Sequence, residues 1–172
     1  MVVSGMQGAG KTTVADRLAR RLRRAARVNA DSLQEMIVSG ARWPERREMS
    51  AEAARQLRLR LRNACLLARS FVDAGFSAVV DDIVIGARLD DLLGELHGRR
   101  FIFVMLAPRL ETIRERERGR GTRLWQEWGW MDAEIRTATR RVGLWLDSSD
   151  QSPDETVDEI LRRAWAEGWV TS

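Results

Sequence analysis

Residues 5 to 12 have the types and the spacing that phosphate binding requires. Their sequence, G-M-Q-G-A-G-K-T, matches the pattern G-x-x-x-x-G-K-[ST] at every fixed position. Glycines here permit positive φ values and a close backbone approach, so that successive N–H groups can surround a phosphate. Lys11 would neutralise β- and γ-phosphate oxygens, and the Thr12 hydroxyl would bind Mg²⁺. We therefore predict ATP and Mg²⁺ as cofactors, with nucleotide contacts from Gly5, Gln7, Gly8, Ala9, Gly10, Lys11, Thr12 and Thr13.

Lys11 is the only lysine among the 29 Lys and Arg residues of the chain. A compact ammonium on a flexible stem fits beside phosphate oxygens better than a planar, directional guanidinium does. The retained lysine therefore supports a phosphate-binding and catalytic role for Lys11.

Asp31 follows Asn29 at the end of a predicted second strand, where parallel α/β folds place ligands. A carboxylate at that edge could take the proton of an attacking hydroxyl, which makes Asp31 the candidate catalytic base. The alternative is that Asp31 only caps the next helix, since Asp is a favoured cap residue.

Asp81 and Asp82 end the apolar segment FSAVV. This is the position of a carboxylate that binds Mg²⁺ in phosphate-loop proteins, and we favour Asp81 for that metal role. The role of Asp82 stays open, because paired acids after a strand also form turns.

The segment from 114 to 123 contains five arginines, with glycines at 119 and 121. Such a run is often an ion-paired helix surface, for which Glu115 and Glu117 would be partners. Glycines that break the helix would instead make the segment, to about residue 130, an arginine-rich lid that closes over the phosphates and excludes water. The tryptophans at 43, 125, 128 and 130 either belong to the core or stack on a substrate.

Apolar segments that alternate with amphipathic ones predict an α/β fold with a five-stranded parallel sheet. The expected strands lie at 1–4, 27–30, 76–82, 100–107 and 143–147. The expected helices begin at 11, 33, 50, 87, 108 and 152. Ser50 and Ser152 are predicted N-caps, and Gly75 is a predicted helix end.

Length and composition fit one domain spanning residues 1–172, in a chain that is 44% hydrophobic and 31% charged, and the glycine loop, Asp31 and the arginine-rich segment make it a predicted P-loop kinase domain. There is no apolar run that could cross a membrane and no secretory leader, and Cys65 is the only cysteine, so we expect a cytoplasmic protein. The net charge of +4 is small enough for a phosphate-binding enzyme and does not require a nucleic-acid surface.

The chain resembles the chloramphenicol phosphotransferase-like small P-loop kinases of the shikimate kinase and nucleoside monophosphate kinase class. The resemblance covers nearly the whole chain and rests on GMQGAGKTT, Asp31, VVDD, LDSS and the set Arg116, Glu117, Arg120, Gly121 and Arg123. It implies a P-loop NTPase three-layer fold with strand order 2-3-1-4-5 and phosphorylation of a 3′- or primary hydroxyl. It also implies that Asp31 is the base and that Arg120 and Arg123 serve as lid or adenine-side contacts. We therefore count Arg120 and Arg123 among the candidate catalytic residues, and Arg116 and Arg120 among the candidate nucleotide contacts.

The chain departs from shikimate kinase in having Asn29 where that enzyme has a metal-side acid, and it lacks the glycine triplet expected after the third strand. Shikimate is therefore not the expected acceptor. The leading hypothesis is a kinase whose partner is a small-molecule hydroxyl acceptor resembling an antibiotic or a sugar. The alternatives are a polynucleotide 5′-hydroxyl kinase and a nucleotide-binding regulatory module without transfer activity.

Overall fold

The computed structural model describes residues 1–44, 49–119, 121 and 125–171. Its centre is a sheet with the strand order β2-β3-β1-β4-β5, in which all four neighbouring pairs are parallel. This confirms the predicted α/β class and strand order. The strands are β1 (Val2–Gly5), β2 (Ala25–Asn29), β3 (Ser77–Asp81), β4 (Arg100–Leu106), β5 (Leu144–Leu146) and β6 (Trp169–Thr171).

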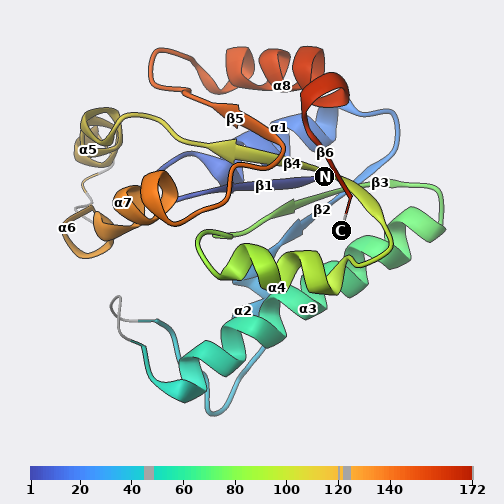
Figure 1. Cartoon of the computed structure of the whole chain (residues 1–172), viewed down its shortest axis with the longest axis horizontal. Coiled ribbons are helices and arrows are strands. Elements are labelled where there is room, and N and C mark those ends of the chain that lie inside the picture. The colour runs from blue at the N-terminus through green and yellow to red at the C-terminus, as the bar shows by residue number, and fades with distance from the viewer. Residues whose placement is uncertain (45–48, 120, 122–124, 172) are drawn as a thin grey trace.

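Helices cover both faces of the sheet and give the fold its three layers (Figure 1). One face carries α1 and α8, which pack on each other, and the other carries α3 and α4. The buried centre includes Phe103 and Leu18, both with no exposed surface. The helices are α1 (Lys11–Arg21), α2 (Ala30–Glu35), α3 (Ala51–Asp73), α4 (Arg88–Glu95), α5 (Leu110–Gly119), α6 (Trp125–Trp128), α7 (Trp130–Thr137) and α8 (Pro153–Glu167).

The predicted helix caps are confirmed. The Ser50 side chain accepts a hydrogen bond from the Ala53 amide, and Ser152 and Glu155 form a capping box at the start of α8. Gly75 follows α3 with a φ of 81°, a value that favours glycine. Local hydrogen bonding of this kind needs no tertiary partner, which is why sequence identifies it well.

Three details of the fold differ from the prediction. A sixth strand, β6, pairs antiparallel with the first half of β4, and its three residues are too short to show a strand pattern in sequence. Strand β2 ends at Asn29, so Asp31 lies in the first turn of α2 and not at a strand end. Phe71 continues the apolar spacing of Leu57, Leu61, Ala64 and Ala68 along α3, which indicates a buried position, but it is 38% exposed.

The carboxyl ends of the parallel strands lead into the segments that form the candidate site. Helices α5, α6 and α7 lie at this end of the sheet, whereas Met1 lies toward the other (Figure 1). Within the described residues, none of the helices combines the length and the apolar character that a membrane span requires.

Candidate active site

The glycine loop connects β1 directly to α1, as predicted. Gly5, Gly8 and Gly10 have φ values of 153°, 81° and 95°. A Cβ on Gly5 would lie 2.5 Å from the Leu106 carbonyl oxygen, and one on Gly8 would lie 2.8 Å from a methyl group of Ile113. These two glycines are therefore required both by backbone conformation and by close packing against β4 and α5.

A cavity of about 120 Å³, which we call the phosphate cavity, lies against this loop. Lys11 lines it, and its Nζ donates to the Met6 carbonyl oxygen at 2.9 Å. Burial lowers the pKa of Lys11 to about 8, and the carboxylates of Asp31, Asp82 and Asp81 oppose that decrease. A partly buried cation on the wall of this cavity is suited to a phosphate group. The lining residues are Gln7, Gly8, Gly10, Lys11, Thr12, Thr13, Asp31, Asp81, Asp82 and Ile83.

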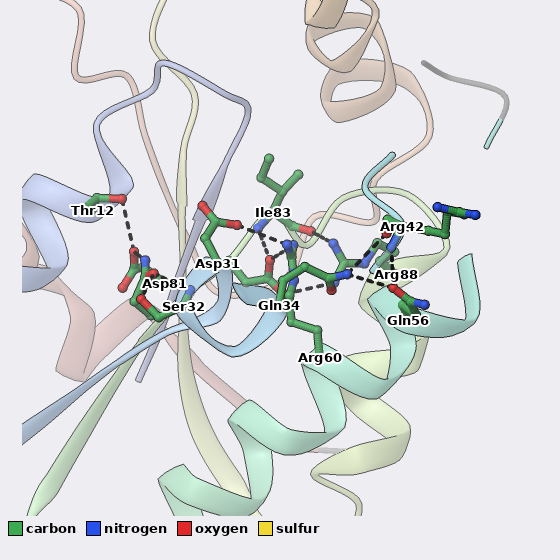
Figure 2. Close-up of polar contacts among 12 residues, drawn as sticks. Thr12, Asp31, Ser32, Gln34, Arg42, Gln56, Arg60, Asp81, Ile83 and Arg88 are labelled. Atoms are coloured by element: carbon green, nitrogen blue, oxygen red, sulfur yellow. Dashed lines mark hydrogen bonds and ion pairs between the residues drawn. The ribbon is translucent and has the colours of Figure 1, made fainter. Parts of the chain in front are cut away.

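Asp81 is buried and fully hydrogen-bonded (Figure 2). Its Oδ2 accepts hydrogen bonds from Thr12 Oγ1 at 3.2 Å and from Asn29 Nδ2 at 2.7 Å. Arg27 donates to both carboxylate oxygens, at 3.0 and 3.2 Å. The Thr12 hydroxyl and the Asp81 carboxylate thus lie together, and they are oxygen donors of the kind that Mg²⁺ prefers, so this pair fits a magnesium ion. The Asn29 amide orients the Asp81 carboxylate through this hydrogen bond, whereas an acid at position 29 would repel that carboxylate.

Asp82 is a buried counterion and not a turn former. Its Oδ1 accepts from Arg60 Nη2 at 2.5 Å and from the Ile83 amide at 2.7 Å, and its Oδ2 accepts from Arg88 Nη2 at 2.9 Å. The Asp82 side chain has no exposed surface, so its charge requires such partners. Asp82 thereby joins α3 and α4 to the end of β3.

Asp31 is the most accessible of the three carboxylates, with 56% of its side chain exposed. Asn29 is the N-cap of α2, because its side-chain oxygen accepts from the Ser32 amide at 2.9 Å. The predicted alternative, that Asp31 only caps this helix, is therefore wrong. Its Oδ1 instead accepts from Arg60 Nη1 at 3.0 Å, which fixes the carboxylate at the edge of the phosphate cavity (Figure 2).

A second cavity of about 420 Å³, which we call the acceptor cavity, adjoins the first through Gln7, Asp31 and Ile83, which line both. Trp43, Trp128 and Trp130 contribute to its wall. Its other lining residues are Pro44, Met49, Leu57, Arg60, Ile85, Ala87, Arg88, Met131 and Glu134.

Two glutamines hold the loop that carries Trp43. Gln56 accepts hydrogen bonds from Gln34 Nε2 at 3.0 Å and from the Arg42 amide at 2.7 Å, and it donates to the Gly40 carbonyl oxygen at 2.9 Å. Gln34 Nε2 also donates to the Arg42 carbonyl oxygen at 3.2 Å. Gln34 on α2 and Gln56 on α3 thus form a buried amide network with the backbone of Arg42 (Figure 2). This network holds the loop that places Trp43 in the cavity wall.

The structure describes only part of the arginine-rich segment from 114 to 123. Arg116 lies on α5, and its Nη2 donates to the carbonyl oxygens of Ser148 and Gln151, at 2.6 and 3.4 Å. Arg116, a predicted nucleotide contact, lines a small cavity together with Ala9, Gly10 and Thr13 of the glycine loop and the start of α1. The helix ends at Gly119, and Gly121 has a φ of 71°. Arg120 and Arg123 lie outside the described residues.

Sequence reasoning did not identify Arg60, Arg88 or Arg27 as site residues. Arg60 could have been identified, because it lies next to Leu61 among the apolar residues that α3 buries. In the structure its side chain is only 4% exposed. A cation on an apolar helix face needs a buried acid as its partner, and Asp82, which follows Asp81, was a candidate for that partner. Arg88 and Arg27 had no comparable signal, since arginines are common throughout this chain.

Family comparison places this site in a known group. The family model described as an AAA domain matches residues 1–128, and the chain belongs to this family. No curated protein matches the chain. The family match and the structures below confirm the predicted resemblance to small P-loop kinases.

Solved structures share the fold at low sequence identity. The tunicamycin resistance protein of Deinococcus radiodurans superposes with a TM-score of 0.69 at 17% identity, over 100% of this chain and 98% of that chain. A gluconokinase from Sinorhizobium meliloti gives 0.65 at 19% identity, over 95% and 92% of the two chains. The shikimate kinase of Aquifex aeolicus gives 0.60 at 17% identity, over 94% and 92%. These values establish a shared fold.

Proposed function

We propose that this protein is an ATP- and Mg²⁺-dependent phosphotransferase that moves the γ-phosphate of ATP to a hydroxyl group of a small molecule. The observation that carries this proposal is the position of Asp31, which lines both the phosphate cavity and the larger acceptor cavity. A carboxylate at that boundary can contact a hydroxyl on one side while the phosphate lies on the other. A hydrolase or a switch would not need the second cavity.

In the transfer step, a carboxylate oxygen of Asp31 accepts the hydroxyl proton of the acceptor. The acceptor oxygen forms a bond to the γ-phosphorus, and the bond from that phosphorus to the β,γ-bridging oxygen breaks. The products are the phosphorylated acceptor and ADP. Arg60 holds Asp31 at its Oδ1, which leaves Oδ2 for the hydroxyl.

The phosphates of ATP would lie on the glycine loop, with Lys11 beside the β- and γ-phosphate oxygens. Thr12 and Asp81 would hold Mg²⁺, which supplies positive charge to the phosphate oxygens when bound. Arg116 lines a separate small cavity that shares Gly10 and Thr13 with the phosphate cavity, and we assign it to the nucleoside side of ATP.

The proposal is tested by following ADP release with ATP, Mg²⁺ and a panel of hydroxylated acceptors that includes neutral alcohols, sugars, sugar acids and a 5′-hydroxyl oligonucleotide. At least one small acceptor should stimulate ADP release above the rate without acceptor. A response to the oligonucleotide alone, or to no member of the panel, would contradict the proposal.

The matched variants are Asp31→Asn and Asp158→Asn. Asp31→Asn should lower kcat for transfer by about a hundredfold or more, because it removes the proton acceptor, while ATP still binds. Asp158→Asn breaks only the exposed ion pair with Arg21 and should leave transfer unchanged. Equal transfer by both variants would refute the role of Asp31.

A further inference from the structure

We propose that Asp82 determines the substrate class of the acceptor cavity, by engaging both arginines that line it. The cavity then selects uncharged acceptors with an apolar body over acceptors that carry an anionic group. This inference rests on the proposed function and specifies the acceptor that it leaves open.

Both guanidinium groups of the cavity are already engaged. Among the described residues that line it, Arg60 and Arg88 are the two cations. Arg60 donates from Nη1 to Asp31 and from Nη2 to Asp82, and Arg88 donates from Nη1 to the Ile83 carbonyl oxygen and from Nη2 to Asp82. The Nε atoms of both arginines are buried from solvent. Each Nη nitrogen of the two arginines therefore already donates a hydrogen bond, and each Nε is buried, so the pairs of nitrogens that bind a carboxylate or phosphate best are engaged with protein oxygens or buried.

The positive charges of these arginines are matched by the carboxylates that they bind, and Glu134 adds a further acid to the cavity lining. Arg60 and Arg88 contribute two positive charges, and the carboxylates of Asp82 and Asp31 contribute two negative charges at distances of 2.5 to 3.0 Å. An anionic acceptor would lose its hydration on entering and would face the Asp31 carboxylate without an uncommitted cation among the described lining residues. An uncharged acceptor avoids that cost.

The remaining wall favours an apolar body. Trp128 and Trp130 lie with their ring centroids 6.4 Å apart, and Trp43 lines the same cavity together with Leu57 and Met131. Aromatic and aliphatic surfaces of this kind bind flat or apolar groups through burial and ring contacts. With Asp31 at one boundary, the cavity suits a molecule that presents a hydroxyl from an apolar body.

The test compares two probes that share an aromatic body and a primary hydroxyl and differ in charge: 4-(hydroxymethyl)benzamide and 4-(hydroxymethyl)benzoate. Binding is measured by quenching of tryptophan fluorescence, and transfer by ADP release with ATP and Mg²⁺. The unsubstituted protein should favour the benzamide by about tenfold or more in Kd and in kcat/KM, because both arginines of the cavity are already paired with carboxylates and cannot pair with the benzoate. Equal or tighter binding of the benzoate, or binding of neither probe, would overturn the inference.

The variant Asp82→Asn tests the residue itself. It removes the negative charge that engages both arginines, so the preference for benzamide over benzoate should fall by about tenfold. Circular dichroism and thermal unfolding establish that the variant is folded, and Asp158→Asn is the control for an Asp→Asn change at an exposed ion pair. An unchanged preference in folded Asp82→Asn would overturn the inference. If that variant does not fold, the two probes on the natural sequence still decide.

Failure of the inference is distinguishable from failure of the proposed function. If sugar acids or the benzoate stimulate ADP release as well as uncharged acceptors do, the phosphotransferase assignment stands and the selectivity assignment is wrong. If no acceptor of any charge stimulates ADP release, the proposed function itself fails, and the inference fails with it.

Discussion

The phosphate cavity and the acceptor cavity adjoin each other but are built in different ways. The phosphate cavity measures about 120 Å³, and six of its ten lining residues lie between Gln7 and Thr13. The acceptor cavity measures about 420 Å³ and takes its residues from the glycine loop, α2, the loop before α3, α3, the segment after β3, α4, α6 and α7. Most of the lining of the phosphate cavity belongs to one short segment, whereas the acceptor cavity exists only because distant segments fold against one another.

This difference has a functional meaning. The phosphate groups of a nucleotide are the same in every reaction, so one loop of fixed conformation can bind them. An acceptor differs from enzyme to enzyme, so its cavity is assembled from loops and helix ends that can change without disturbing the sheet. Asp31 lines both cavities and therefore lies between the part of the site that binds phosphate and the part that binds the acceptor.

The largest expected effect is on the phosphate cavity. Lys11→Ala should lower kcat/KM for ATP by about a thousandfold, because it removes the one lysine that can neutralise the phosphates. Binding of ATP, measured by calorimetry, should weaken as well, whereas binding of an acceptor in the absence of ATP should change little. Full activity of Lys11→Ala would contradict the assignment of the phosphate site.

The next effect is on stability and tests the contact between β1, which leads into the glycine loop, and the segment after β3, from which Ile83 lines both cavities. Ser4 on β1 donates to the Val84 carbonyl oxygen and accepts from the Val84 amide, both at 2.9 Å and both buried. Ser4→Ala removes this partner from both the amide and the carbonyl oxygen of Val84 and should lower the free energy of unfolding by about 2 kcal/mol. Urea unfolding measures the change, and Ser70→Ala at an exposed position of α3 is the control, with little change expected. A loss in Ser4→Ala no larger than in Ser70→Ala would show that the pair does not hold β1 to this segment.

Truncation of a tryptophan in the acceptor cavity should weaken binding of the acceptor without weakening binding of ATP. Trp128→Ala removes aromatic surface from the acceptor cavity and should raise KM for the acceptor about tenfold, while KM for ATP stays within about twofold. Steady-state kinetics with each substrate varied in turn measure both values. Trp165→Ala, at an exposed tryptophan of α8 that does not line this cavity, is the control. A larger effect on ATP than on acceptor would contradict the separation.

The smallest effect comes from pH. Burial lowers the pKa of Lys11 to about 8, so in the free protein its positive charge is present below pH 8 and is lost above it. If only the charged form binds phosphate well, Kd for ATP should rise about fourfold from pH 7 to pH 8.5, and ATP binding should take up a proton. Lys11→Arg should lack this dependence, because arginine stays charged. A Kd for ATP that does not vary with pH would show that Lys11 does not titrate in this range.

Several parts of the fold were predictable because local interactions determine them. The caps at Ser50 and Ser152 and the glycine conformations of the phosphate loop follow from hydrogen bonds and steric limits within a few residues. The parallel sheet order was predictable only through the resemblance to small P-loop kinases. Strand β6 was missed because its three residues become a strand only by pairing with β4.

For the site, the sequence by itself determined the phosphate loop, its lysine and the two candidate carboxylates Asp31 and Asp81. It also showed that tryptophans cluster near the arginine-rich segment, but not whether they form core or cavity. Only the tertiary structure decided that Asp82 is a buried counterion of Arg60 and Arg88, and that Trp43 and Trp128 line one cavity. The physical reason is distance along the chain. A phosphate loop makes its contacts within eight residues, whereas Asp82 and Arg60 are 22 residues apart, and their pairing depends on how α3 packs against the sheet.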